Sequence, residues 1–195
     1  QLELKLIADV GIIGFPNAGK STLISRISAA KPKIADYPFT TLTPNLGVVK
    51  VGDYSNFVVA DIPGLIKGAH QGVGLGIMFL KHIERTSLFI HLVDVSGMNG
   101  RDPMEDYEDI QYELKMYDEM NKGKDGFFPL MEREQMIVLN KIDLLSADQI
   151  EKLKQKFKKK TGAEVYTISA VTGKNTQDFL VHVADKILKA KNVIY

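Results

Sequence analysis

The sequence contains no cysteine and no long apolar run. Without cysteine there can be no disulfide scaffold and no thiolate zinc site, and such a composition is compatible with a reducing cytoplasm, where we expect the protein to reside. No stretch approaches the roughly 20 apolar residues that cross a bilayer, and no signal peptide is recognisable. The formal net charge is +1, so overall charge favours neither nucleic acid nor a membrane surface.

The rest of the composition is ordinary for a globular domain. The chain has 195 residues, of which 45% are hydrophobic and 25% are charged. This length is enough for one α/β domain with a full core. Because the chain starts at Gln1 rather than methionine and enters a strand-like alternation at once, we interpret residues 1–195 as a single domain cut from a longer protein.

Apolar strand patterns alternate with helical patterns along the chain. The patterns predict strands at residues 10–13, 46–51, 57–61, 88–95, 136–139 and 165–168, and helices at 21–27, 77–85, from 103, from 146 and at 176–190. The short link between the second and third strands implies an antiparallel pair. The sequence therefore predicts an α/β fold with about six mostly parallel strands, one antiparallel edge strand and helices on both faces.

Residues 14–21 read Gly-Phe-Pro-Asn-Ala-Gly-Lys-Ser and fit the phosphate-binding pattern G-x-x-x-x-G-K-[ST]. A strand pattern precedes this P-loop and a helical pattern follows it, so backbone N–H groups and a helix N-terminus converge on one anion. Lys20 adds a positive charge for the outer phosphates, and the Ser21 hydroxyl is placed for Mg²⁺. The motif predicts a nucleoside triphosphate without naming its base.

A carboxylate follows the strand pattern at 57–60, in the segment Asp61-Ile62-Pro63-Gly64. P-loop enzymes hold Mg²⁺, usually through water, with a carboxylate that ends a buried strand. Gly64 brings a backbone N–H close to the γ-phosphate because no Cβ obstructs the approach. Asp94 ends another apolar strand and is the rival candidate, but the Asp-x-x-Gly context favours Asp61, and we expect Asp94 to cap its strand end.

The most discriminating motif is the Asn-Lys-Ile-Asp segment at 140–143, directly after a strand pattern. Its carboxylate, Asp143, can pair with the N1–H and exocyclic amine of guanine, a donor pair that adenine lacks, so the wrong base would leave it unpaired. We expect Asn140 to tie the segment to the P-loop and the Lys141 stem to lie over the ring. Residues 169–171, Ser-Ala-Val, are expected to offer a backbone N–H to the guanine oxygen.

The stretch from 31 to 44 has three prolines and no clean period, and such long irregular segments are usually functional. A threonine within 39–43 is placed to complete the Mg²⁺ shell opposite Ser21 only when the γ-phosphate is present. That dependence is the physical basis of a switch. Residue chemistry alone leaves both Thr40 and Thr41 open.

These motifs, in this order, resemble the GTPase domain of the Obg family of ribosome-associated bacterial GTPases, also called CgtA. The matching runs cover residues 8–11, 14–22, 31–37, 39–42, 44–47, 61–66, 68–76 and 82–86, and then 100–103, 140–143 and 169–171. The resemblance implies that Thr41 is the Mg²⁺ threonine, that GTP hydrolysis is slow, and that guanosine tetraphosphate (ppGpp) is sensed. It also implies a role in late assembly of the large ribosomal subunit, and a glycine-rich N-terminal domain and a C-terminal domain that these 195 residues lack.

The predicted site can be stated residue by residue. Catalytic roles fall to Lys20, Thr41, Gly64 and Asn17, and Mg²⁺ binding falls to Ser21, Thr41 and Asp61. The predicted nucleotide-binding residues are Gly14, Phe15, Pro16, Asn17, Ala18, Gly19, Lys20, Ser21, Thr22, Phe39, Thr40, Thr41, Leu42, Thr43, Asp61, Ile62, Pro63, Gly64, Asn140, Lys141, Ile142, Asp143, Ser169, Ala170 and Val171.

The position after Asp-x-x-Gly is Leu65, where Ras-like enzymes carry the glutamine that orients the attacking water. One interpretation is a nearly inactive binding module. The other is that help comes from elsewhere, because Asn17 resembles the asparagine with which other glutamine-lacking GTPases hold K⁺ beside the phosphates. A cation there offsets developing charge, and we therefore predict hydrolysis that K⁺ stimulates.

Several other polar residues have two interpretations. His70 and Gln71 are either water-positioning groups or exposed loop residues, whereas His82 and His91 are expected to be packing or surface residues. The segment 151–160 is either a solvated helix face or a ribosomal RNA contact; its lysines are Lys152, Lys154, Lys156, Lys158, Lys159 and Lys160.

Together these observations predict a Ras-like P-loop NTPase that binds GTP and GDP with Mg²⁺ and hydrolyses GTP slowly. We expect a monomeric switch that reaches the large ribosomal subunit or its RNA through the full-length protein. The alternative is a non-catalytic sensor of GTP, GDP or ppGpp. An ATP-using P-loop protein is disfavoured by Asp143.

Overall fold

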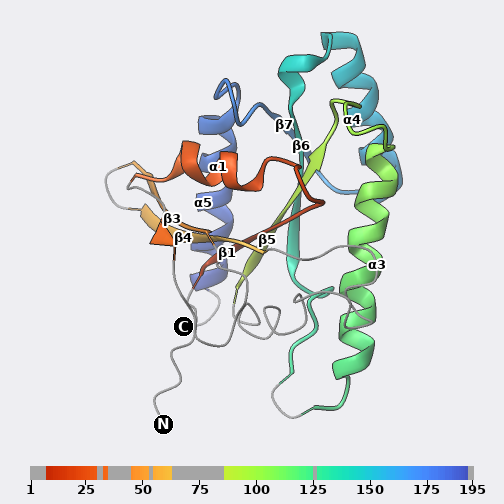
Figure 1. The fold of residues 1–195 in the computed structure, drawn as a ribbon. Helices are drawn as coiled ribbons and strands as arrows, with labels where there is room; N and C mark the ends of the chain where they lie inside the picture. Colours follow the sequence, from red (N-terminus) through yellow and green to blue (C-terminus); the bar gives the residue numbers. More distant parts are fainter. Residues whose placement is uncertain are drawn as a thin grey trace.

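The computed structural model describes residues 8–29, 33–34, 45–52, 55–62, 86–124 and 127–192. In this part of the chain a seven-stranded sheet has the strand order β2-β3-β4-β1-β5-β6-β7 (Figure 1). The strands are β1 Val10–Ile13, β2 Lys33–Ile34, β3 Asn45–Val51, β4 Ser55–Asp61, β5 Leu88–Asp94, β6 Glu134–Asn140 and β7 Val165–Ile168. The helices are α1 Lys20–Ile27, α3 Pro103–Asn121, the 3-10 turn η2 Ile142–Leu144, α4 Ala147–Thr161 and α5 Thr176–Asn192.

The sheet is mixed, as predicted. Strand β1 pairs in parallel with β4 and β5, and β5, β6 and β7 continue the parallel arrangement. Strand β3 runs antiparallel to β4. The short β2 pairs antiparallel with the start of β3, where Lys33 lies opposite Leu46 and Ile34 opposite Asn45.

Strand β2 lies within the stretch that we expected to be irregular, so β3 is not the outermost strand. The predicted count of about six strands omitted it, because two residues are too few for an alternating pattern to be recognised. The α/β class and the antiparallel pair at 45–61 are confirmed. The predicted helix at 77–85 and the strand-like alternation before residue 8 lie outside the described residues.

Helices cover both faces of the sheet (Figure 1). On one face, apolar side chains of α1 and α5 pack with alternate residues of β1, such as Val10 and Ile12. On the other face, α3 packs over Ile13 and Phe89, and Phe157 of α4 packs against β6 and β7. Because both faces of the central strands are covered, β1, β5 and most of β6 are buried without interruption.

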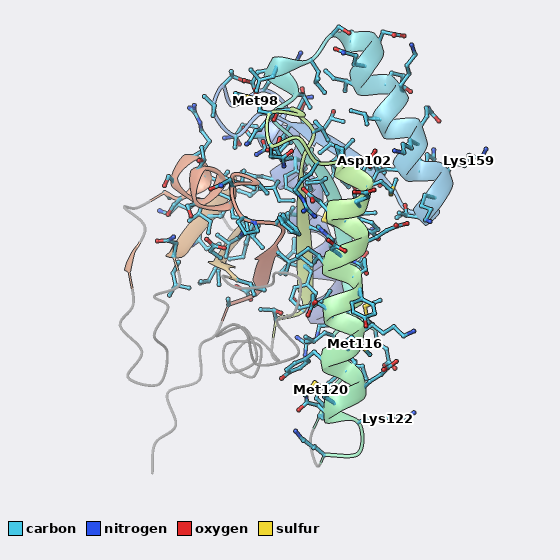
Figure 2. The ribbon with its side chains drawn as sticks, turned by 45° about the vertical axis from the view of Figure 1, so that its right-hand side comes forward. Met98, Asp102, Met116, Met120, Lys122 and Lys159 are labelled. Atoms are coloured by element: carbon cyan, nitrogen blue, oxygen red, sulfur yellow. The ribbon has the colours of Figure 1, made fainter. Side chains whose placement is uncertain are left out.

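The predicted starts of α3 and α4 are confirmed by their caps. The Asp102 carboxylate accepts backbone N–H groups at the start of α3, and Ser146 and Gln149 form a reciprocal capping box at the start of α4. Gly162 ends α4 in the left-handed conformation. Figure 2 shows α3 from Asp102 at its start to Met116, Met120 and Lys122 towards its end, with Lys159 of α4 at the level of Asp102.

The arrangement gathers five strand ends at one edge. The carboxyl ends of the parallel strands β1, β4, β5, β6 and β7 lie at the same edge of the sheet, where ligands bind in open α/β folds. The segments that follow these strands are the ones singled out from the sequence. In the described part of the chain, no helix has the length and apolarity needed to cross a bilayer.

Candidate nucleotide-binding site

The P-loop joins β1 to α1 and depends on two glycines. A Cβ at Gly14 would lie 2.3 Å from the carbonyl oxygen of Leu92, and one at Gly19 would lie 2.4 Å from Nδ2 of Asn140. Gly19 is also the N-cap of α1, has φ of 99°, and offers no side-chain cap. The first N–H groups of α1 are therefore left without a side-chain acceptor, which suits them to an anion.

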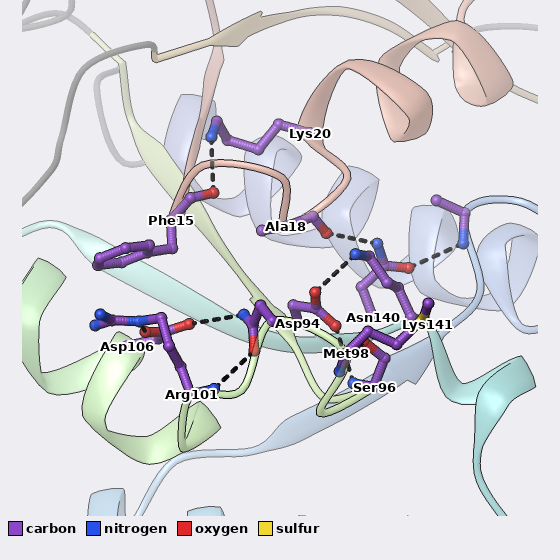
Figure 3. A network of polar contacts seen from close by, with 12 residues as sticks. Phe15, Ala18, Lys20, Asp94, Ser96, Met98, Arg101, Asp106, Asn140 and Lys141 are labelled. Carbon is purple, nitrogen blue, oxygen red and sulfur yellow. Dashed lines mark hydrogen bonds and ion pairs between the residues drawn. The ribbon is translucent and has the colours of Figure 1, made fainter.

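Lys20 lies folded over this loop. Its Nζ donates to the carbonyl oxygens of Gly14 at 3.0 Å and Phe15 at 3.2 Å, and Figure 3 shows the second of these contacts. Burial lowers the pKa of Lys20, while the nearby Asp61 carboxylate acts in the opposite direction. The ammonium is thus held at the mouth of the phosphate cradle by acceptors weaker than a phosphate oxygen.

Asp61 and Ser21 form the candidate Mg²⁺ site. The Ser21 hydroxyl donates to Asp61 Oδ2 at 3.1 Å, and Asn45 Nδ2 donates to the Ser21 Oγ at 3.2 Å. The other carboxylate oxygen, Oδ1, is buried and has no hydrogen-bond partner among the described residues. Burial raises the pKa of Asp61, against the charge of Lys20 and the hydrogen bonds from Ser21 and Asn45. A hydroxyl beside an unsatisfied carboxylate oxygen fits a hard divalent cation.

The rival carboxylate, Asp94, has different partners. Its Oδ1 accepts the Ser96 N–H at 2.9 Å, and its Oδ2 accepts Lys141 Nζ at 2.7 Å (Figure 3). Although burial acts to raise it, the hydrogen bonds from Lys141 and Ser96 lower the pKa of Asp94. Asp94 thus caps the end of β5, as expected, and in addition anchors the lysine of the base-recognition motif.

Asn140 joins the P-loop, the base-recognition motif at 140–143 and the turn at 169–171. Its side chain is 1% exposed, its Nδ2 donates to the Ala18 carbonyl at 2.8 Å, and its Oδ1 accepts the Ala170 N–H at 2.9 Å (Figure 3). The expected tie to the P-loop is therefore present, together with a second tie to residues 169–171. Asp143 is exposed on the turn η2, where its carboxylate is accessible to a base.

The turn after β7 is closed by its own hydrogen bonds. Ser169 N–H donates to the Lys174 carbonyl, Gly173 N–H donates to the Ser169 carbonyl, and Thr172 N–H donates to the Ser169 hydroxyl. The Ala170 N–H, one of the predicted donors to guanine, is engaged by Asn140. The turn is therefore rigid, and its orientation decides which groups face a bound base.

Sequence reasoning missed three residues at this site. Asn45 holds the Ser21 hydroxyl, Arg26 binds the carbonyls of the turn at 169–171, and Arg101 lies 4.2 Å from the centre of the Phe15 ring. Arg101 is itself held by Asp106 and Asp109. No local pattern marks these roles, although Asn45 lies two residues after the threonine-rich segment at 39–43.

Other predicted residues lie outside the described part of the chain. These are Phe39, Thr40, Thr41, Leu42, Thr43, Pro63, Gly64, Leu65, His70, Gln71 and His82. Asn17 is described and has φ of 64°, and its K⁺-binding role stays a prediction. His91 is buried, with its Nδ1 3.1 Å from Gln111 Nε2 and its ring 4.6 Å from that of Tyr107. It is a packing residue, as expected.

Comparisons with known proteins agree with this geometry. A family model described as "50S ribosome-binding GTPase" matches residues 9–141, more than half of the chain. Curated relatives named "GTPase Obg" are 75% identical over 97% of this chain in Bdellovibrio bacteriovorus, and 50% identical over 97% in Thermosipho africanus. The chain covers 55% and 42% of those relatives, so it spans about half their length.

Solved structures support the fold. A variant of Aquifex aeolicus Era bound to GDP.AlF4- matches with a TM-score of 0.65 and 24% identity, over 90% of this chain and 55% of that one. The G domain of the T. maritima FeoB iron transporter matches with a TM-score of 0.60 and 22% identity, over 92% of this chain and 96% of that one. The fold is that of the Ras-like P-loop GTPases.

The fold and the site therefore define a GTP-binding domain of the P-loop class. The chain belongs to the GTPase family that the matching model describes, and within it to the Obg type.

Proposed function

We propose that this chain binds GTP and GDP together with Mg²⁺, hydrolyses GTP slowly and acts as a nucleotide-dependent switch. The observation that carries the proposal is the position of Asn140, which bonds to Ala18 of the P-loop at 2.8 Å and to Ala170 at 2.9 Å. One buried side chain thus holds the phosphate loop, the base-recognition motif and the turn after β7 in a fixed arrangement. Such preorganisation favours one ligand that spans all three.

In this arrangement each group has a defined task. The α1 N-terminus and Lys20 stabilise phosphate charge, and Asp143 is the acceptor for the guanine donors. Ser21 and Asp61 would hold Mg²⁺, with Thr41 as a further ligand by family resemblance. The ion supplies neutralisation of charge on the β- and γ-phosphate oxygens.

A nucleotide titration tests the base assignment. Asp143→Asn reverses the hydrogen-bonding sense of the side chain, so it should weaken guanine binding at least tenfold and favour xanthine nucleotides. Binding of fluorescent GDP, competed by GTP, XTP or ATP, gives the ranking. Asp148→Asn, on the exposed face of α4, is a matched control. Unchanged guanine preference in Asp143→Asn would contradict the assignment.

K⁺ is proposed as a second cofactor, held with the help of Asn17. The support is the sequence pattern, in which Leu65 replaces the water-positioning glutamine, together with the location of Asn17 in the P-loop. We expect faster single-turnover hydrolysis in KCl than in NaCl, and loss of the difference in Asn17→Asp. Equal rates in both salts would reject the role of K⁺.

Single-turnover hydrolysis also decides between the switch and the alternative, a non-catalytic sensor of GTP, GDP or ppGpp. Phosphate release that stays at the uncatalysed rate with and without K⁺ would favour the sensor. Competition of ppGpp with GDP for binding is expected under both functions, so it does not separate them.

A role in assembly of the large ribosomal subunit is proposed for the full-length protein, which we expect to be a cytoplasmic monomer. The description of the matching family supports it. On α4, Lys156 and Lys160 pair with Asp102 and Glu108 of α3, whereas Lys158 and Lys159 have no acidic partner among the described residues. If α4 contacts RNA, Lys158→Ala/Lys159→Ala should weaken ribosome binding and reduce its salt dependence. Unchanged binding would leave α4 a solvated face.

A further inference from the structure

Arg26 connects two parts of the site that lie far apart in the sequence. It projects from α1, the helix that begins at the P-loop, and its Nε donates to the Ala170 carbonyl at 3.2 Å, 144 residues further along the chain. Its Nη2 donates to the Val171 carbonyl. The planar guanidinium thus binds two successive carbonyls of the turn after β7 with two separate N–H groups.

These contacts are the direct polar link between α1 and that turn. Within the described ranges, no other hydrogen bond joins residues 20–27 to residues 169–173. The junction is otherwise open, with a hollow of about 390 Å³ lined by Thr22, Ser25, Arg26, Ala170 and Val171. Ala170 is buried in the same core cluster as Leu23 and Ile24 of α1, and beside this apolar contact the guanidinium of Arg26 makes the polar contacts that hold the turn.

Asn140 and Arg26 hold the turn from two sides. Asn140 accepts the Ala170 N–H, and Arg26 binds the Ala170 and Val171 carbonyls. In a planar trans peptide the C=O and the N–H point in opposite directions. Because Arg26 fixes the carbonyl of the Ala170–Val171 peptide, it also fixes the direction of the Val171 N–H, which has no partner among the described residues.

We propose that Arg26 is a positioning residue for guanine recognition. It holds the turn at 169–171 so that the Val171 N–H faces the O6 oxygen of the base. The inference rests on the proposed function, because it requires guanine at this site. It concerns an exposed helix residue that belongs to none of the predicted motifs, and it acts through Ala170 and Val171 rather than by touching the nucleotide.

The test compares two ligands, of which the second lacks O6 and, with it, the N1–H of guanine. The lost pairing of N1–H with Asp143 is the same in every variant, so it cancels when the variants are compared. Affinities of the full-length protein for GDP and for 2-aminopurine riboside diphosphate, which lacks O6, are measured for the wild type, Arg26→Ala and Arg26→Lys. Lys154→Ala, at a partly exposed site of α4, is the control. A charge-assisted hydrogen-bond pair lost at a half-exposed site should weaken GDP binding about tenfold.

If Arg26 acts through the base contact, Arg26→Ala weakens GDP binding, but its affinity for the 2-aminopurine nucleotide stays within about twofold of the wild-type value. The preference for GDP over the 2-aminopurine nucleotide is therefore much smaller in the variant than in the wild type. Arg26→Lys replaces the planar guanidinium by one compact ammonium group, so it should restore only part of the preference for GDP. The GDP dissociation rate should rise in parallel with the loss of affinity.

Equal loss for both ligands would overturn the inference, since it would mark a general structural or electrostatic effect. Unchanged GDP affinity in Arg26→Ala would overturn it as well. A wild-type protein that binds the two ligands equally would instead overturn the proposed guanine site, and the inference with it. If Arg26→Ala fails to fold, the Arg26→Lys ratio decides in the same way.

Discussion

At the scale of single residues, the site contains a buried carboxylate that lowers the stability of the ligand-free protein. Asp61 is 7% exposed, and its Oδ1 is buried without a partner among the described residues. A buried carboxylate oxygen without a donor destabilises the folded state. The same oxygen is ready to bind a cation, so this cost is the structural counterpart of a preformed metal site.

Asp61→Asn should therefore stabilise the Mg²⁺-free protein while impairing metal binding. The folded-state pKa of Asp61 is raised by burial, so its penalty is absent below the unfolded-state value and grows as pH rises through the folded-state value. Above the folded-state value the penalty is present, and removing the charge should raise the free energy of unfolding.

Thermal unfolding at pH 7 without Mg²⁺ measures this gain, and Mg²⁺ titration of the GDP complex measures the loss, which should be at least tenfold. The matched control is Asp148→Asn, because the Asp148 side chain is 73% exposed. A lower stability of Asp61→Asn without Mg²⁺ would show that the hydrogen bonds of Asp61 outweigh its desolvation.

His91 should make the protein sensitive to acid. Burial, and secondarily the charge of Lys20, lowers the pKa of His91 to about 3, whereas an unfolded histidine titrates near 6.5. Below that pH the unfolded chain binds a proton that the folded protein does not, so stability falls as pH falls. Between pH 7 and pH 5 the loss should be about 2 kcal/mol.

His91→Gln is neutral throughout this range, so its free energy of unfolding should depend on pH less steeply by about this amount. Urea unfolding at pH 5, 6 and 7 gives both curves, and groups common to the two proteins cancel in the difference. Parallel curves for wild type and variant would contradict a neutral, buried His91.

At the scale of elements, the sequence predicts what depends on local pattern. The buried runs of β1, β5 and β6 and the starts of α3 and α4 were recognisable, because each is encoded within a few residues. Strand β2 was missed because it has two residues. Asn45 and Arg26 were missed because their contacts join residues 24 and 144 positions apart, and no local signal encodes such pairs.

Helix α4 depends on its capping box. The Ser146 hydroxyl accepts the Gln149 N–H, and the Gln149 side chain accepts the Ser146 N–H at 2.9 Å. Ser146→Ala should lower the free energy of unfolding by about 1 kcal/mol, because it leaves an N–H of the first turn without an acceptor. Urea unfolding checks the value.

Lys154→Ala, in the middle of the same helix, controls for general effects of substitution and should change stability by less than about 0.5 kcal/mol. Asp143 lies three residues before the cap, so GDP affinity of Ser146→Ala is also informative. Equal stability of the two variants would show that the box contributes nothing in this protein.

At the scale of the whole molecule, segments that follow four different strands meet at one edge of the sheet. The P-loop follows β1, Asp61 ends β4, Asn140 ends β6 and Ser169 follows β7. Hydrogen bonds of Asn140 and Arg26 join three of these segments without a ligand. A nucleotide that contacts the P-loop, the base-recognition motif at 140–143 and the turn at 169–171 at once would add contacts between segments that few side chains join in the free protein.

Binding of GDP with Mg²⁺ should therefore raise the melting temperature of the protein, and ADP with Mg²⁺ should not. At a hundred times its dissociation constant, a ligand that binds only the folded state adds about 2.7 kcal/mol, which for a chain of this size corresponds to about 5–10 °C. Without nucleotide, Asn140→Ala should unfold at a lower temperature than the wild type, because it leaves the Ala18 carbonyl and the Ala170 N–H unpaired. The rise in its melting temperature on binding GDP should be less than half of that of the wild type.

Differential scanning fluorimetry at matched nucleotide concentrations measures both effects, with Lys154→Ala as the variant expected to match the wild type. Equal shifts with ADP and GDP would contradict guanine selectivity, and a full GDP shift in Asn140→Ala would mean that the loops bind the nucleotide without this connecting side chain.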